Sequence, residues 1–169
     1  MRQGNPLAGR VLVVSGQMHG NEWPGPLIVK RIRGFSLSAT GPAQVWTVRT
    51  MNPDGAKANG RYNARGVDLN ANFPHDWRYQ SRNGPRYAGT RAKSEPETRA
   101  MLRFLRWVQP DLVISFHGFS TSVDTTGGGL RAARARTFSQ LTNITPAHPV
   151  PCSGPCHGNM TDWYSAASK

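Results

Sequence analysis

Short runs of consecutive apolar residues alternate along the chain with segments in which apolar residues recur every three or four positions. Residues 11–15, 44–50 and 112–116 are continuous, largely β-branched and apolar runs, which predict buried strands. Residues 24–33 predict a helix, because prolines fall only in its first turn and Gly34 follows as a stop. Strands and helices thus alternate through the first part of the chain.

A second, clearer helical pattern lies before the third apolar run. Ser94 and Glu97 have the spacing of a capping box, in which each side chain bonds a backbone amide at the start of a helix. Apolar side chains then recur at helical spacing until Pro110. Residues 51–89 lack sustained periodicity and predict a long loop with short ordered pieces, and loops of this length in compact domains are usually functional or disordered. Residues 130–141 and 160–167 predict weaker ordered segments.

This order of elements predicts the α/β class. We expect a mixed, largely parallel central sheet with helices on both faces, since crossover helices cover the two faces of a parallel sheet. The chain has 169 residues, no repeats and no linker-like segment, so residues 1–169 predict one domain.

Composition narrows the class of protein. The formal charge is +12, but its arginines and lysines are scattered, which is typical of a solvated surface and disfavours a nucleic-acid binder. An arginine-rich protein that binds an anionic polymer remains the third interpretation. No apolar run approaches the roughly 20 residues of a membrane helix, so we expect no membrane insertion. The first residues show no apolar leader, which leaves two locations open, the bacterial cytoplasm or export without a visible leader.

The two cysteines, Cys152 and Cys156, lie in a loop rich in proline and glycine. Their spacing permits a small disulfide or two free thiols. With His148 and His157 nearby they are also compatible with a second metal clamp, although the spacing matches no common zinc motif. The sequence alone leaves these alternatives open.

Histidines follow two of the predicted strands. His19 and Glu22 come after the first apolar run, and His117 comes directly after the third. Ligands in open α/β sheets bind outside the carboxyl ends of strands, so these side chains are expected at one rim. Two nearby ligands plus a remote third leave one coordination position open, which is typical of a catalytic zinc site. His75, beside Asp76 in the long loop, is expected on the surface instead.

Five motifs occur in a recognisable order, and together they resemble the zinc carboxypeptidase family of carboxypeptidase A type. The pattern is most similar to its compact bacterial members, the murein peptide amidases. The motifs are HGNE at residues 19–22, NPDG at residues 52–55, RYNARGVDLNANFP at residues 61–74, SEPET at residues 94–98 and SFHG at residues 115–118.

The resemblance implies a fold and a set of roles. It implies an α/β/α sandwich in which His19, Glu22 and His117 hold Zn²⁺ and a water fills the open position. Arg61 matches the arginine that polarises the scissile carbonyl, and Asn70 matches the asparagine that helps bind the terminal carboxylate of the substrate. The implied activity is that of a metallopeptidase, hydrolysing peptide or amide bonds in short peptides, with murein peptides as a candidate substrate. We expect a monomer.

The chain departs from the family pattern after Asn70. The family has an arginine at the next position, where it grips the terminal carboxylate, and this chain has Ala71. Losing one charge-assisted pair weakens affinity by roughly 10 to 150-fold. Arg65 is a candidate to bind the substrate in its place, or the substrate presents another group.

The second departure concerns the general base, which in the family is a glutamate on a late strand. The chain has three glutamates: Glu22, assigned to zinc, and Glu95 and Glu97, at the start of a helix. Asp124 and Asp162 are the acidic residues that follow His117. We therefore expect a domain that is truncated before its last strand and helix. The alternative is a catalytically impaired zinc protein that binds peptide or cell-wall fragments.

Overall fold

The computed structural model of the chain describes residues 1–118, 122–125, 129–147 and 156–167. The chain forms two compact units, of which one comprises Met1–Gly118 with His157–Lys169 and the other Phe119–Cys156. The expectation of one domain over the whole chain stays a prediction, and each unit is described by itself below.

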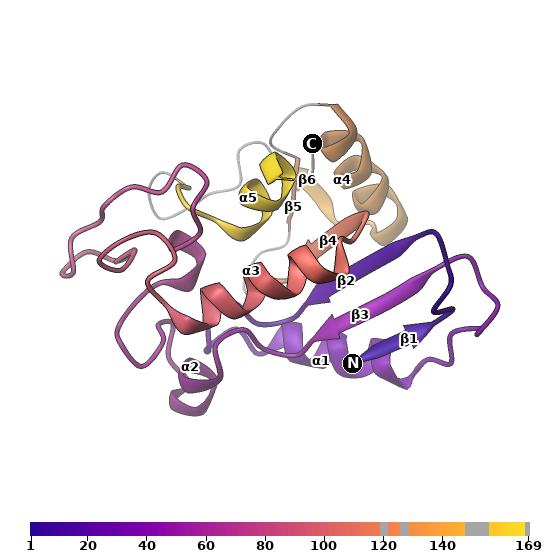
Figure 1. The fold of residues 1–169 in the computed structure, drawn as a ribbon, viewed down its shortest axis with the longest axis horizontal. Helices are drawn as coiled ribbons and strands as arrows, with labels where there is room; N and C mark the ends of the chain where they lie inside the picture. Colours follow the sequence, from indigo (N-terminus) through magenta and orange to yellow (C-terminus); the bar gives the residue numbers. More distant parts are fainter. Residues whose placement is uncertain (119–121, 126–128, 148–155, 168–169) are drawn as a thin grey trace. The chain divides into compact units, whose positions relative to one another are not determined.

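The larger unit is built on a four-stranded sheet with the order β1-β3-β2-β4 (Figure 1). Strand β2 pairs in parallel with both β3 and β4, whereas β1 pairs antiparallel with β3. This arrangement confirms the mixed, largely parallel α/β sheet expected from the sequence. The strands are β1 (Arg2–Gly4), β2 (Val11–Ser15), β3 (Gln44–Val48) and β4 (Leu112–Ser115). Strands β3 and β4 end slightly earlier than predicted, and β1 was not predicted.

Helices cover both faces of this sheet, as expected. On one face Val13 packs with Leu105 of α3 (Pro96–Val108) and Trp163 of α5 (Met160–Ala167). On the other face Val14 packs with Val29 of α1 (Pro24–Gly34). Figure 1 shows α3 in front of the sheet and α1 behind it. Apolar side chains therefore cover both faces of the sheet. This packing holds in place the strand ends that carry the candidate ligands.

The start of α3 differs from the predicted capping box. The N-cap residue is Glu95, and no side chain caps the helix. Ser94 is engaged elsewhere, since its hydroxyl accepts a hydrogen bond from Asn72 Nδ2 at 2.9 Å and donates one to Glu95 Oε1 at 2.7 Å. Pro96 begins the helix and disfavours a helical conformation in the residue before it. The capping-box prediction was wrong because the Ser94 hydroxyl bonds with Asn72 and Glu95 and does not cap the helix.

That loop contains short ordered pieces, as predicted. It contains α2 (Pro53–Ala58), capped by the Asn52 side chain, and the short 3₁₀ helix η1 (Leu69–Ala71), capped by Asp68. Phe73 is fully buried in the core of the unit. The loop lacks periodicity because asparagine and aspartate side chains, more than a repeating apolar face, hold its backbone in place.

The smaller unit contains one helix and a pair of short parallel strands among its described residues. Helix α4 (Gly129–Thr142) confirms the helix predicted at residues 130–141, while β5 (Ser122–Asp124) and β6 (Thr145–Ala147) were not predicted. His148 and Cys152 lie outside the described residues. Cys156 is disulfide-bonded, so of the alternatives left open for the cysteines the two free thiols are wrong.

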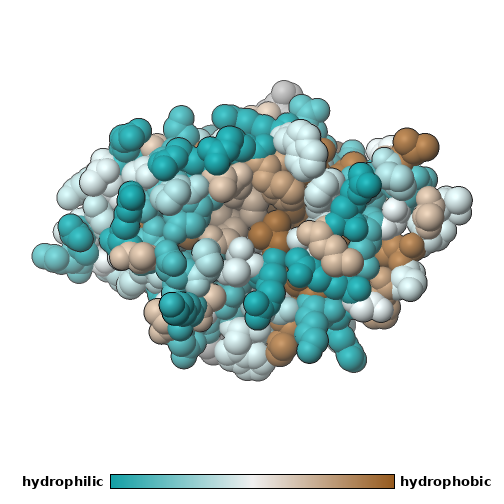
Figure 2. All heavy atoms as spheres, turned by 60° about the horizontal axis from the view of Figure 1, so that its bottom comes forward, coloured by the Kyte–Doolittle hydropathy of each residue, from teal (hydrophilic) through white to brown (hydrophobic). Residues whose placement is uncertain are grey.

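The surface carries both charged and apolar side chains. Figure 2 shows hydrophilic residues over most of one face and a hydrophobic patch exposed near its centre. None of the described helices is long and apolar enough to cross a membrane.

The contact between α1 and the end of β2 gives a first testable prediction. A Cβ added to Gly25 would lie 1.2 Å from the carbonyl oxygen of Gly16, so the two backbones must separate in Gly25→Ala. We expect this variant to lose about 1 to 3 kcal/mol of unfolding free energy, as overpacked cores do. Gly34→Ala, in the same helix but with nothing within 4 Å, is the matched control. Urea unfolding of both variants compares them, and equal stabilities would contradict this packing.

Candidate metal centre

The turn between β2 and α1 carries the first two candidate ligands. Strand β2 ends at Ser15, and the backbone amide of Glu22 donates to the carbonyl of His19 at 3.1 Å, which closes the turn. The side chain of Gln17 supports this turn by donating to the carbonyl of Gly20 at 2.7 Å. Both candidate ligands are buried, with His19 3% and Glu22 5% exposed.

The third candidate ligand comes from the neighbouring strand. The amide of Phe116 donates to the carbonyl of Ser15 at 2.8 Å, which continues the pairing of β4 with β2 up to His117. Gly118 then passes close to Glu22, since a Cβ at Gly118 would lie 2.9 Å from the Glu22 side chain. The sheet therefore delivers His117 beside the turn, as the positions of the strand ends predicted.

The three side chains converge. His19 Nδ1 lies 2.8 Å from Glu22 Oε1, and His117 Nδ1 lies 3.2 Å from Glu22 Oε2. One donor atom from each residue lies within 4.8 Å of the other two. We refer to His19, Glu22 and His117 as the metal triad. In the part of the chain that the structure describes, this is the group of histidine, cysteine and acidic residues positioned to share one ion.

The donor set fits zinc. Two imidazole nitrogens and one carboxylate oxygen are the ligands that Zn²⁺ takes in catalytic sites with three protein ligands. The far nitrogen of His19, Nε2, donates to Asp68 Oδ1 at 3.0 Å. A carboxylate in this position fixes the orientation of a ligand histidine and raises its basicity. The chain thus supplies three candidate ligands and a carboxylate that supports one of them.

The residues of the metal triad and Asp68 also shift one another's pKa values. Burial would raise the pKa of Glu22, but hydrogen bonds from His117 and His19 hold that pKa at about 2. Burial would lower the pKa of His19, but its contacts with Asp68 and Glu22 outweigh burial and raise that pKa. The pKa of Asp68 is held far below its usual value, because the His19 and Arg61 contacts outweigh burial. Both carboxylates are therefore anionic at neutral pH.

Asp68 is a hub that the sequence did not predict. It is fully buried, and its Oδ2 accepts from Arg61 Nη2 at 2.7 Å. Arg86, which is 5% exposed, lies 4.0 Å from the same oxygen. The backbone amide of Asn70 donates to Oδ1 at 3.0 Å. Asp68 lies within the motif GVDLN, but nothing in the local pattern indicated that His19, Arg61 and Arg86 would meet at its carboxylate.

The other candidate residues differ in how closely they approach the hub. Arg61 contacts Asp68 directly and is 35% exposed, so it reaches both the hub and solvent. Asn70 is half-buried, and its Oδ1 accepts from the backbone amide of Met160 at 3.4 Å. Arg65 is exposed, and its side chain makes no hydrogen bond or ion pair that involves the described residues. The structure therefore brings Arg61 and Asn70 to the hub, but not Arg65.

Ala71 and His75 can also be placed. Ala71 is buried, 2% exposed, and its carbonyl lies so close to Gly158 that a Cβ there would approach it to 2.4 Å. His75 is exposed, as expected. The side chain of Asp162 accepts a hydrogen bond from Asn159 Nδ2, and the backbone amide of Asp162 donates one to Asn159 Oδ1.

The family assignment follows from comparison with known proteins. The family model described as zinc carboxypeptidase matches residues 3–137. The chain belongs to the zinc carboxypeptidase family.

Individual relatives agree with this assignment. The chain is similar to murein peptide amidase A of Escherichia coli (strain K12), with 38% identity over 82 residues, covering 41% of this chain and 34% of that protein. It is also similar to the carboxypeptidase N catalytic chain of Mus musculus, with 31% identity over 145 residues, covering 67% of this chain and 32% of that protein. These matches thus span about a third of either relative.

The fold has a close counterpart among solved structures. The crystal structure of a murein-tripeptide amidase from Escherichia coli O157 superposes with a TM-score of 0.75 at 23% identity, covering 98% of this chain and 73% of that chain. At this identity the likeness establishes the fold alone. It confirms the zinc carboxypeptidase-like architecture expected from the sequence.

Proposed function

We propose that this protein is a zinc-dependent hydrolase of peptide or amide bonds in short peptides, with murein peptides as the candidate substrate. The observation that carries the proposal is the metal triad, whose donor atoms lie within 4.8 Å of one another. Membership of the zinc carboxypeptidase family supports the same reaction class. The names of the relatives, among them a murein peptide amidase, support the choice of substrate.

His19, Glu22 and His117 would hold the ion. A bound Zn²⁺ supplies Lewis acidity and lowers the pKa of a coordinated water, which makes that water a nucleophile at neutral pH. The protein's own contribution is to hold His19 in one orientation through Asp68, and to bury the anionic Glu22 next to both histidines.

Arg61 is positioned to act on the substrate. Asp68 holds one edge of its guanidinium through Nε at 3.2 Å and Nη2 at 2.7 Å, while a third of the side chain remains exposed. A guanidinium fixed in this way presents its remaining N–H groups to a carbonyl oxygen and stabilises the negative charge that develops there. Asn70, anchored through Met160, is proposed to contact the far end of the substrate.

Two observations favour a second candidate, a zinc protein that binds peptide or cell-wall fragments without cleaving them. Ala71 offers no charge to a terminal carboxylate, and the carboxylates of Glu95 and Glu97 bond with the Asn63 side chain instead of the triad. Among the described residues, the second carboxylate at the triad is that of Asp68, and it already bonds with His19 and Arg61.

A hydrolysis assay separates the two candidates. Zinc-loaded protein is incubated with murein tripeptide, and the products are followed by mass spectrometry with and without a chelator. We expect cleavage that stops on chelation and returns when zinc is restored. Calorimetric binding of the peptide without any cleavage during long incubation would instead establish the binding protein.

The role of Arg61 gives a further prediction. In Arg61→Gln, kcat/KM should fall by about 100-fold, the lower end of the loss seen when an oxyanion donor is removed. Arg91→Gln, which changes an exposed arginine, is the control and should retain the activity. Zinc content and circular dichroism confirm that both variants are folded and loaded. Equal kcat/KM values in the two variants would remove Arg61 from the proposed mechanism.

A further inference from the structure

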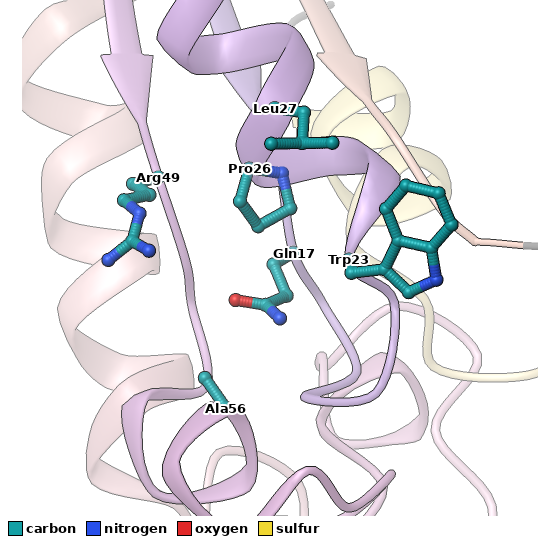
Figure 3. Close-up of a pocket in the computed structure, with 6 residues that line it drawn as sticks. All are labelled: Gln17, Trp23, Pro26, Leu27, Arg49 and Ala56. Carbon is teal, nitrogen blue, oxygen red and sulfur yellow. The ribbon is translucent and has the colours of Figure 1, made fainter.

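A hollow of about 290 Å³ opens beside the first turn of α1, in the larger unit. It is lined by Gln17, Trp23, Pro26, Leu27, Arg49 and Ala56. Figure 3 shows Gln17 and Pro26 in the middle, with Arg49 and Trp23 on opposite sides. None of these residues belongs to the metal triad or to the Asp68 hub. The volume lies at the lower limit of the about 300 to 1,000 Å³ of small-molecule sites, so a ligand here would be compact.

One wall of the hollow is apolar and uncovered. Trp23 is 61% exposed and Leu27 is 52% exposed, with Pro26 between them in the sequence. Single exposed apolar residues are common, whereas two that lie together at a concave surface offer an apolar group of a ligand a place to pack. An aromatic or branched apolar group would bury this wall.

Two polar side chains line the same hollow and can still form hydrogen bonds or ion pairs with a ligand. Arg49, just past the end of β3, is exposed, and its guanidinium makes no hydrogen bond or ion pair with the described residues. Gln17 is 7% exposed, and its Nε2 already donates to the carbonyl of Gly20. Its Oε1 therefore remains as a hydrogen-bond acceptor. The hollow thus offers a cation, a single acceptor and an apolar wall.

We propose that this hollow binds an N-acylated apolar amino acid, the group that forms the carboxyl end of a short peptide. The carboxylate pairs with Arg49, the amide N–H donates to Gln17 Oε1, and the apolar side chain packs on Trp23 and Leu27. Each of the three features of the ligand matches one feature of the hollow. The proposal goes beyond the proposed hydrolase function and does not require it, since the hollow holds no ligand of the metal.

Calorimetry with three probes tests the proposal. N-acetyl-L-phenylalanine carries all three features, N-acetyl-L-phenylalaninamide lacks the charge, and N-acetylglycine lacks the apolar side chain. The titrations use protein treated with chelator, and are repeated on His117→Ala, so that binding at the metal triad is removed. We expect the acid to bind about tenfold more tightly than the amide, as one charge-assisted pair at an exposed site allows, and N-acetylglycine to bind more weakly still.

Variants then locate the bound probe. Arg49→Gln should weaken binding of the acid about tenfold and leave binding of the amide unchanged, whereas Trp23→Ala should weaken both. Arg103→Gln and Trp107→Ala, which alter an exposed arginine and a 71% exposed tryptophan on α3, are the matched controls and should bind as the parent does. Loss of binding in His117→Ala, no effect of Arg49→Gln, or no binding of the acid would each overturn the proposal. These outcomes do not depend on whether the protein hydrolyses peptides.

Discussion

Replacing His117 with alanine should lower the affinity of the protein for Zn²⁺ by more than about 100-fold. The variant removes one of the three proposed ligands, and the loss of an outer-shell partner alone already costs about 10 to 100-fold. His117 is the proposed ligand that follows β4, whereas His19 and Glu22 are proposed ligands in the turn after β2. Without it the ion would be held by two neighbouring side chains from one turn. Competition with a chromogenic chelator measures the affinity.

His75→Ala is the matched control for this experiment, because His75 is an exposed histidine outside the metal triad. It should bind one zinc ion as tightly as the parent protein. If His117→Ala and His75→Ala have the same affinity, the ion is bound elsewhere, and the assignment of the triad is wrong.

Replacing Asp68 with asparagine should destabilise the metal-free protein by about 3 to 5 kcal/mol, the usual cost of removing one partner of a buried charge pair. The variant keeps the shape of the side chain but removes the charge that faces His19, Arg61 and Arg86. Arg86 is 5% exposed and cannot turn to water without rearrangement of its surroundings. Urea unfolding measures the loss.

Asp54→Asn is the control, since Asp54 is an exposed carboxylate in the first turn of α2. Its unfolding free energy should stay within about 0.5 kcal/mol of the parent value. The same Asp68 variant should also bind Zn²⁺ about 10 to 100-fold more weakly, because His19 loses its supporting carboxylate. Parent-like stability and affinity together would show that Asp68 is not the hub of the site.

The strand ends and the metal triad could be predicted because each depends on a local pattern and one rule of topology. The run at Val11–Ser15 forms β2 with the predicted bounds. The carboxyl ends of parallel strands share one edge of a sheet, and this rule brings His117 to Glu22 across a long separation in sequence. Neither step needs knowledge of the side-chain packing.

Other features depend on tertiary contacts that no local pattern encodes. The three residues of β1 have no apolar repeat, and the strand exists because its backbone pairs with β3. Ser94 has the spacing of a helix cap but bonds with Asn72. Asp68 lies in a loop without periodicity, yet its carboxylate bonds with both Arg61 and His19 in the folded protein.

Diffraction from crystals of the zinc-loaded protein, recorded at the zinc absorption edge, tests the central claim most directly. The account predicts one strong anomalous peak bounded by Nδ1 of His19, the carboxylate of Glu22 and Nδ1 of His117. A peak at another group of residues, or an empty triad in crystals whose zinc content is stoichiometric, would contradict it.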